Sequence, residues 1–236
     1  MEKNLSIEFY DQELETLSGA GLNYLPYIGC KVPDLPPDKR LIILGESCYA
    51  WKDNAEEIAV DPMHIRKNVY DHMFDSGFFT NIVKAVTGYE KITKEQREKF
   101  WELTMFHNLV TTPMTNNKQR PSEHDYEKGW NAFWELQKVL RPSACIMLGT
   151  DKVKINTFVS ALHTKIHFID NKELNLQYPK IGRYYAKVLD VPMHDEIVKF
   201  IFIKHPSSYF IWKNWHDLLK IHLVELLNYY QYEIIK

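Results

Sequence analysis

The sequence predicts a three-layer α/β/α sandwich around a central, mostly parallel sheet of about four to five strands. Short apolar runs alternate along the chain with longer segments of helical periodicity, the pattern of a parallel sheet with helices on both faces. The run before Gly45 is apolar throughout and does not alternate with polar residues, as expected of a strand that is covered on both sides. Turn-forming residues bound most of the runs.

Size and composition favour one domain over residues 1–236. The chain has 236 residues, of which 45% are hydrophobic, enough for one sizeable core. Residues 1–40 contain a short possible helix from Ile7 to Leu17 and then frequent Gly and Pro, so we expect an irregular covering arm there. The net charge of -2 carries no global signature of a nucleic-acid binder, although a neutral total leaves room for a local basic groove.

Cysteine usage and the N-terminus indicate a cytoplasmic protein without a metal or another cofactor. Cys30, Cys48 and Cys145 are far apart, odd in number and lack Cys-x-x-Cys spacing, which argues against disulfides, zinc and iron–sulfur clusters. His107 and His124 have no metal partner at a credible spacing. No signal-peptide core and no run of membrane-spanning length is present, so we expect no membrane contact.

The first strand is predicted at Leu41–Leu44, where four apolar residues precede Gly45. A polar loop then follows, with Glu46, Ser47 and Tyr49. Ligands of open α/β sheets bind at the carboxyl ends of the strands, so this loop is where we expect chemistry. The alternative is a tight turn whose polar groups only cap the next helix.

The first half of the chain then predicts three helices. Their signals are an N-cap followed by proline, a helix closed by glycine, and a capping box. The helices are expected from Asp61–Pro62 to about Asp75, from the Gly77–Asn81 segment through Ala85 to Gly88, and from Thr93 with Gln96 through Phe100 and Trp101.

The second half continues the alternation of strands and helices. Strands are predicted at 105–110, 144–148, 165–169 and 199–203, helices at 122–140, 151–162 and 212–232, and irregular segments at 111–121 and 171–192. Parallel strands would bring the loops after residues 44, 109, 148 and 203 to one edge. Glu46, Asn108 and His205 would then share one cleft if their strands are neighbours.

Three motifs in this order resemble the uracil-DNA glycosylase superfamily. They are Gly45-Glu46-Ser47-Cys48-Tyr49 after the first strand, Asn108-Leu109-Val110-Thr111-Thr112 followed by His124 and Gly129-Trp130, and His205-Pro206-Ser207-Ser208 after the last strand. The resemblance covers roughly residues 40–220. It implies a uracil-DNA glycosylase-like fold and a role in base-excision DNA repair, with DNA as the partner.

The resemblance also implies residue roles. Asn108 would read the edge of an extruded base, and His205 would donate a hydrogen bond to the leaving base. Tyr209 and Phe210 would lie where the family inserts a side chain into the duplex, with Ser207 and Ser208 contacting DNA. Tyr49 and Phe79 would shape the base pocket, with Phe78 nearly equivalent to Phe79 as the stacking ring.

The first motif departs from the family. In the common branch it reads Gly-Gln-Asp-Pro-Tyr-His, so Ser47 stands where the family has its water-orienting aspartate or asparagine. Serine can hold a water molecule but is not a general base at neutral pH. Glu46 could take this role if its side chain turns into the cleft. Cys48 replaces the family's proline, and the four cysteines of the iron–sulfur branch are absent.

The leading hypothesis is a DNA glycosylase that hydrolyses the N-glycosidic bond of uracil or another damaged or modified base by base flipping. His205, Glu46 and Ser47 would be the catalytic residues. Lys118, Arg120, Lys204 and Lys213 lie in loops that would border the cleft and contact phosphates, although solvated charge is their ordinary state.

Two other functions stay open. One is a non-catalytic module that binds nucleic acid or a nucleotide on the same fold, and the other is a hydrolase of free nucleosides or nucleotides. Each site residue also has a structural reading. Asn108 and His205 could be loop residues, Glu46 a capping carboxylate and Phe79 a core residue.

Overall fold

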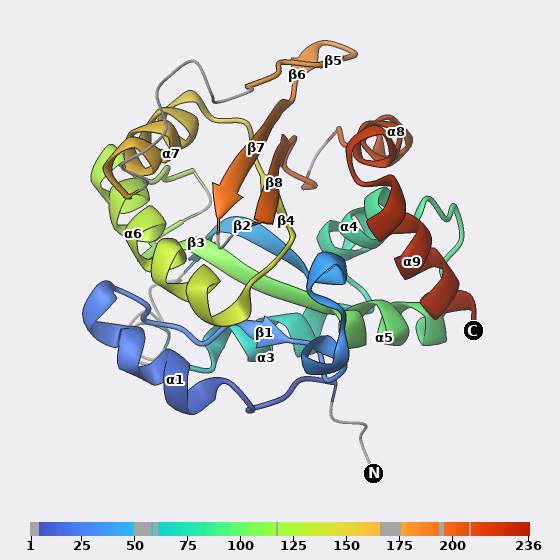
Figure 1. Ribbon diagram of the computed structural model, residues 1–236, viewed down its shortest axis with the longest axis horizontal. Helices are drawn as coiled ribbons and strands as arrows, with labels where there is room; N and C mark the ends of the chain where they lie inside the picture. The colour runs from blue at the N-terminus through green and yellow to red at the C-terminus, as the bar shows by residue number, and fades with distance from the viewer. Residues whose placement is uncertain are drawn as a thin grey trace.

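The computed structural model describes residues 5–49, 58, 61–116, 118–165, 176–193, 196–207 and 209–236. Its architecture is a mixed α/β sandwich with a central six-stranded sheet (Figure 1). The strands of this sheet are β1 (Tyr27–Ile28), β2 (Leu41–Tyr49), β3 (Thr104–Met114), β4 (Ala144–Leu148), β7 (Lys187–Met193) and β8 (Glu196–Ile203).

The strand order is β1-β3-β2-β4-β8-β7. The inner strands β3, β2, β4 and β8 are mutually parallel, while β1 and β7 pair antiparallel at the two edges. The mostly parallel sheet is therefore confirmed, with six strands where about four to five are predicted. The strand predicted at 165–169 falls mainly outside the described residues, and Lys165 is the last residue of helix α7.

Two strands run further than the sequence predicts. Gly45 pairs with Asn108 and Ser47 with Val110, so β2 continues through the segment predicted as a polar loop. Its ladder is interrupted by a bulge between Ser47 and Tyr49. The prediction of a loop over 111–121 is wrong for Thr111–Met114, because β3 continues to Met114, which is in register with Tyr49.

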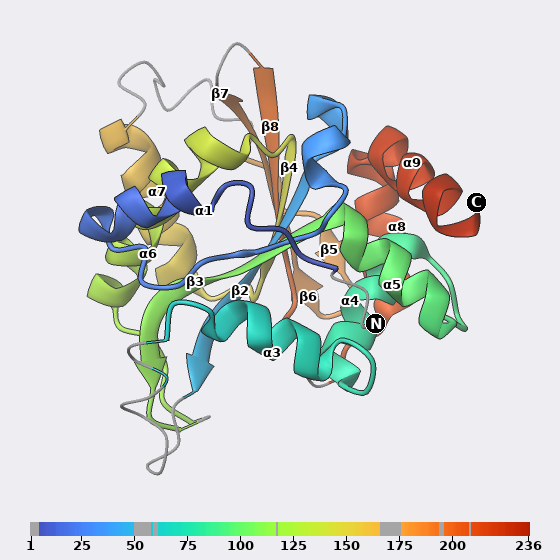
Figure 2. The same cartoon turned by 90° about the horizontal axis from the view of Figure 1, so that it is seen from below.

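Helices cover both faces of the sheet and complete the three layers (Figures 1 and 2). One face carries α6 (Glu123–Leu140) and α7 (Lys152–Lys165), and the other carries α4 (Gly77–Thr87), α5 (Lys94–Leu103), α8 (Trp212–His222) and α9 (Val224–Ile235). Helix α3 (His64–His72) contacts β1 and β3. No helix within the described residues is long and apolar enough to cross a membrane.

The predicted helix boundaries are largely confirmed. Thr93 and Ser122 each form a complete capping box, and Gly88 ends α4 in the left-handed conformation. The helix predicted from Asp61–Pro62 begins only at His64, although the Asp61 carboxylate accepts a hydrogen bond from the backbone N–H of Met63 at 3.0 Å.

Three other segments differ from their predictions. In the covering arm, α1 (Asp11–Glu15) precedes β1, whose residues are fully buried against β3. The segment 171–192 includes β5 (Lys180–Ile181) and β6 (Tyr184–Tyr185), which form a separate hairpin, and most of β7. The single helix predicted at 212–232 is divided at Leu223 into α8 and α9.

Candidate functional site

Polar side chains gather at the carboxyl edge of the parallel strands, as predicted. Glu46 comes from β2, Asn108 from β3 and His205 from the segment that follows β8. Strand β4, between β2 and β8, ends at Leu148. Side chains of α6 and α7 reach Glu46 on this edge.

Glu46 lies in a nearly complete shell of donors. Tyr126 donates a hydrogen bond to Oε1 at 2.9 Å, Arg120 donates to Oε2 at 3.1 Å, and the Lys154 ammonium lies 3.3 Å from Oε1. Lys154 also donates to the backbone oxygen of Leu148 at 2.6 Å. Both charges of the Glu46–Lys154 pair are buried, with 9% and 1% of their side chains exposed.

The donor shell keeps Glu46 ionised. Burial alone would raise the pKa of Glu46, but the Lys154 charge, the hydrogen bonds from Tyr126 and Lys154 and the nearby His205 together hold it below its ordinary value. Burial lowers the pKa of Lys154, and Glu46 opposes this effect. Desolvation and the Glu46 charge both raise the pKa of the Tyr126 phenol, which therefore stays a donor.

Asn108 lies on β3, in register with Gly45 of β2. Its side-chain oxygen lies so close to Gly45 that a Cβ atom there would collide with it, which explains the glycine at this point of the strand. Asn108 is 5% exposed, and its amide makes no hydrogen bond with another described residue. A buried amide without a protein partner is available to pair with a ligand.

Contacts with Ser207 favour one tautomer of His205. The backbone N–H of Ser207 donates to Nδ1 at 3.4 Å, and the Ser207 hydroxyl lies 2.9 Å from the same nitrogen. Because Nδ1 accepts, the proton of a neutral ring is on Nε2. Desolvation lowers the pKa of His205 to about 4, against the opposing effect of Glu46, so the ring is neutral at physiological pH.

The ring next to His205 is Phe78, not Phe79. The Phe78 and His205 centroids are 5.2 Å apart with an interplanar angle of 36°. Phe79 is only 2% exposed and packs edge-on against Trp101 and Phe106, so it belongs to the core. The prediction of Phe79 as the stacking ring is therefore corrected to Phe78, its near equivalent in the sequence analysis.

Consecutive residues of β2 serve different faces of the sheet. Ser47 is in register with Val110 and, by the two-residue period of a strand, shares the face of Asn108. Glu46 points to the other face, where α6 and α7 supply its partners. Tyr49 ends the strand, half-buried and in register with Met114.

The loop after His205 is only partly exposed. Tyr209 is 83% exposed, whereas Phe210 is half-buried and stacks on Trp215 with centroids 6.0 Å apart. Of this pair, only Tyr209 is exposed. Ser207 is exposed, and Ser208 lies outside the described residues. Asn81 donates to the backbone oxygen of Pro206 at 2.9 Å and anchors the loop to α4.

The predicted phosphate contacts divide into two groups. Arg120 is 72% exposed although it contacts Glu46, and Lys204 donates to the backbone oxygen of Tyr209 at 2.9 Å, so both border the site. Lys213 lies 3.6 Å from Glu90, and Lys118 is exposed in the loop before α6. Within the residue ranges described above, no group of three or more His, Cys, Asp or Glu side chains could hold a metal ion.

Lys154 and Tyr126 are parts of the site that the sequence analysis missed. Both belong to helices. The apolar residues around them predict a helix, but they do not show that either side chain is a partner of Glu46. A lysine in the first turn of a helix that follows a buried strand is the one signal that could have raised suspicion.

Comparison with models of known protein families and with curated proteins found no match to this sequence. The functional assignment therefore depends on the geometry of the site and on the motifs that it contains.

Proposed function

We propose that the chain is a uracil-DNA glycosylase-like enzyme that hydrolyses the N-glycosidic bond of uracil or another damaged or modified base in DNA after base flipping. The observation that carries the proposal is the pairing of a neutral imidazole, His205, with an ionised carboxylate, Glu46, at one sheet edge. Such a pair offers one group for each fragment of the broken bond.

His205 would stabilise the leaving base. Cleavage leaves negative charge on the base, and a preorganised donor directed at that charge lowers the barrier. With Nδ1 occupied by Ser207, the Nε2–H of the ring is the donor available to the base oxygen. A neutral imidazole suits this role, because its pKa of about 4 keeps it uncharged before the base departs.

Glu46 would act on the sugar side. The sugar gains oxocarbenium character, which a nearby carboxylate stabilises electrostatically. Tyr126 and Lys154 occupy Oε1, whereas Oε2 has only Arg120, so Oε2 keeps a lone pair for a water molecule. The lowered pKa makes Glu46 a weak base, so its role is to orient water and stabilise charge. Ser47, on the opposite face of β2, could hold a second water on the side of Asn108.

Asn108 and Phe78 would recognise the base. A buried amide can both donate and accept, so it can pair with the edge of one base and reject another. Phe78, half-buried beside His205, offers the ring against which an extruded base could stack.

The test is a glycosylase assay with excess protein and labelled oligonucleotides that carry uracil, hypoxanthine, xanthine or a modified cytosine, single- and double-stranded. Alkali then breaks the strand at any abasic site. We expect breaks with at least one substrate and a loss of about a hundredfold or more in the single-turnover rate for His205→Ala, with little change in binding. Asn108→Ala should change the base preference.

His163→Ala is the matched control, because His163 is exposed on α7 and contacts none of the site residues named above. An equal loss of rate and binding in His205→Ala would contradict the role of His205. Folded protein that breaks no substrate would contradict the glycosylase activity.

The second candidate is a non-catalytic module that binds nucleic acid or a nucleotide on the same fold. It is favoured by Ser47 in place of the family's aspartate and by the three donors that already engage Glu46. This function predicts tight binding to DNA with an abasic site or an extruded base, while modified bases stay intact through long incubation.

A further inference from the structure

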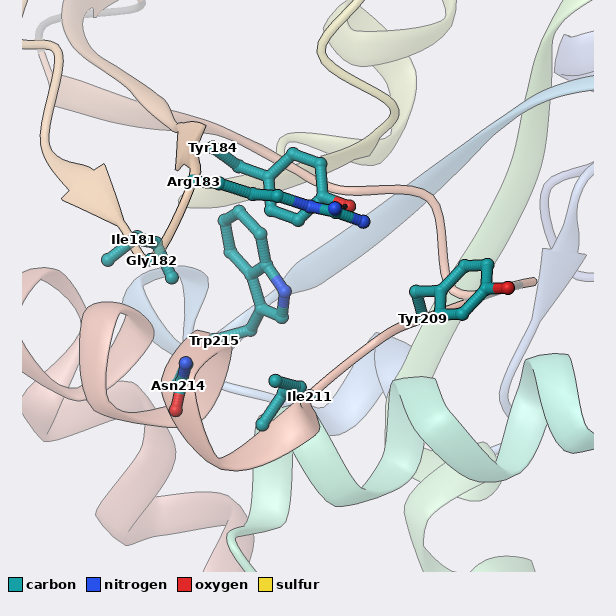
Figure 3. Close-up of a pocket in the computed structure, with 8 residues that line it drawn as sticks. All are labelled: Ile181, Gly182, Arg183, Tyr184, Tyr209, Ile211, Asn214 and Trp215. Carbon is teal, nitrogen blue, oxygen red and sulfur yellow. Dashed lines mark hydrogen bonds between the residues drawn. The ribbon is translucent and has the colours of Figure 1, made fainter.

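A groove adjoins the His205 loop, between the β5–β6 hairpin and the start of α8 (Figure 3). Its volume is about 380 Å³. Arg183 and Tyr184 form one wall, Ile211 and Trp215 lie across from them, and Tyr209 lies to one side. The groove thus combines apolar surface with aromatic rings and a cation.

Two cations lie over the aromatic rings of the groove. The Arg183 guanidinium is 5.2 Å from the centre of the Tyr184 ring, and the Lys204 ammonium is 4.6 Å from the same centre. Lys204 also lies 5.7 Å from the Tyr209 ring. Hydrogen bonds from Lys204 and Arg183 lower the pKa of the Tyr184 phenol, and both charged neighbours of that phenol are cations. The charge of the groove is therefore complementary to an anion.

Tyr209 has an uncommon backbone conformation. Its φ of 48° lies in the left-handed region, which a bulky residue rarely adopts. Lys204 fixes this conformation by donating to the Tyr209 backbone oxygen at 2.9 Å. A strained residue that presents an exposed ring beside a candidate site is a reason to look for a ligand of that ring.

The wall that contains Arg183 and Tyr184 is also fixed in place. Gly182, with φ of 59°, and Arg183 form the two-residue connection between β5 and β6. Glycine at the first position of such a connection is typical of a tight hairpin turn. The turn holds the Arg183 side chain over the groove, as Figure 3 shows.

We infer that this groove binds a nucleotide of single-stranded DNA next to the extruded base, with its base against Tyr209 and its phosphate at Arg183 and Lys204. This inference rests on the proposed function, because Lys204 directly precedes His205 and so joins the groove to that site. Sequence-tolerant binding of single strands uses this combination of aromatic faces and cations. A paired duplex keeps its bases stacked and offers none to Tyr209.

The experiment is fluorescence anisotropy with the full chain and a short labelled oligothymidylate, either alone or paired with its complement. Neither probe carries a damaged base, so binding is measured without any reaction. We expect the single strand to bind about tenfold more tightly than the duplex.

Three variants test the assignment to this groove. Tyr209→Asn removes the ring and keeps a residue that tolerates a positive φ, and it should weaken single-strand binding by about fivefold to a hundredfold. Tyr209→Phe keeps the ring and should bind like the parent. Arg183→Gln should weaken binding at low salt and reduce its salt dependence.

Arg141→Asn is the charge-matched control. Arg141 is exposed at the opposite edge of the sheet, before β4, and its φ of 45° is acceptable to asparagine. An equal effect of Arg141→Asn and Arg183→Gln would overturn the inference, and so would equal binding of single strand and duplex or no measurable binding. Single-strand binding without cleavage of any modified base would support the groove and contradict the proposed activity.

Discussion

Two buried ionisable side chains near the site differ in how they are compensated. Lys154 has a carboxylate and a backbone oxygen as partners, whereas neither ring nitrogen of His107 has a hydrogen-bond partner within the described residues. His107 lies next to Asn108 in β3 and is 3% exposed. Such uncompensated burial costs stability and is detectable as a dependence of stability on pH.

His107 should make the protein sensitive to acid. Burial lowers the pKa of His107 from 6.5 to about 3 in the folded chain, so only the unfolded chain gains this proton as the pH falls below 6.5. The contribution of His107 to the free energy of unfolding is constant above that pH. Between the two pKa values it should fall by about 1.4 kcal/mol for each pH unit. Urea unfolding between pH 7 and about pH 5 measures the slope.

His107→Leu should remove that part of the slope and raise stability at pH 7, because an unpartnered polar group is replaced by an apolar one of similar size. The same substitution at His163, which is exposed, is the control for replacing a histidine by leucine. A His107→Leu profile parallel to that of the parent would contradict this account.

Substitutions in the Glu46–Lys154 pair can distinguish a catalytic role of Glu46 from a structural one. Glu46→Gln leaves the buried Lys154 charge without its counter-ion and should destabilise the fold by about 3–5 kcal/mol. Glu46→Gln combined with Lys154→Met removes both charges, leaves the net charge unchanged and should recover most of that loss. If Glu46 acts on the sugar, the double variant folds but does not cleave. Cleavage at the parental rate would assign Glu46 a structural role only.

The sequence singles out Glu46, Asn108 and His205 as candidates because each lies at or just beyond the carboxyl end of a predicted strand, a position that is informative. It does not single out Lys154, and it does not distinguish Phe78 from Phe79. Phe78 and Phe79 are adjacent and chemically identical, so only the direction of each side chain separates the core residue from the one that contacts His205. That direction is decided by tertiary packing.

At the scale of elements, local signals predict helix starts better than strand ends. Capping boxes at Thr93 and Ser122 depend on residues three positions apart, so they can be found in the sequence. The extension of β2 to Tyr49 and that of β3 to Met114 form because the two strands pair with each other. Strands β1 and β7 form because each pairs with the strand next to it at an edge of the sheet. Local sequence patterns do not show which of these residues pair across the sheet.

The two capping boxes offer a matched test of how α6 supports the site. Ser122→Ala and Thr93→Ala should each cost about 1 kcal/mol of stability, since each removes a side chain that accepts from the helix backbone. Tyr126 lies in the first turns of α6 and donates to Glu46. Only Ser122→Ala should therefore raise the pKa of Glu46, which NMR titration of its carboxyl carbon measures.

Thr93→Ala is the control because α5 supplies none of the donors to Glu46. Similar titration curves in the two variants would show that Tyr126 is positioned by the rest of α6 and not by its N-cap.

At the scale of the whole molecule, the charges nearly cancel. Lysine and arginine number 29 and aspartate and glutamate 31, yet Arg120 contacts Glu46, and Arg183 and Lys204 both lie over the Tyr184 ring. A net charge near zero provides little long-range attraction to DNA. Binding should then depend on these few local contacts.

The salt dependence of binding measures how many contacts there are. Three phosphate contacts to a single strand predict a slope of log K against log salt concentration of about -2. Arg183→Gln should reduce the magnitude of the slope by about 0.7, and Arg141→Asn should not change it. Anisotropy titrations at several salt concentrations give these values. A slope more than twice as steep would place the main contacts outside this set.

The alternation of faces along β2 has a consequence for how this segment can vary among related chains. Gly45 must leave room for Asn108 on one face, and Glu46 must meet Lys154 on the other. Loss or gain of a single residue here would exchange the two faces and displace both groups at once. Evolution can therefore alter the chemistry of this motif by replacing residues, but not by changing its length, and a gap-free alignment across residues 41–47 would mark chains that share the site.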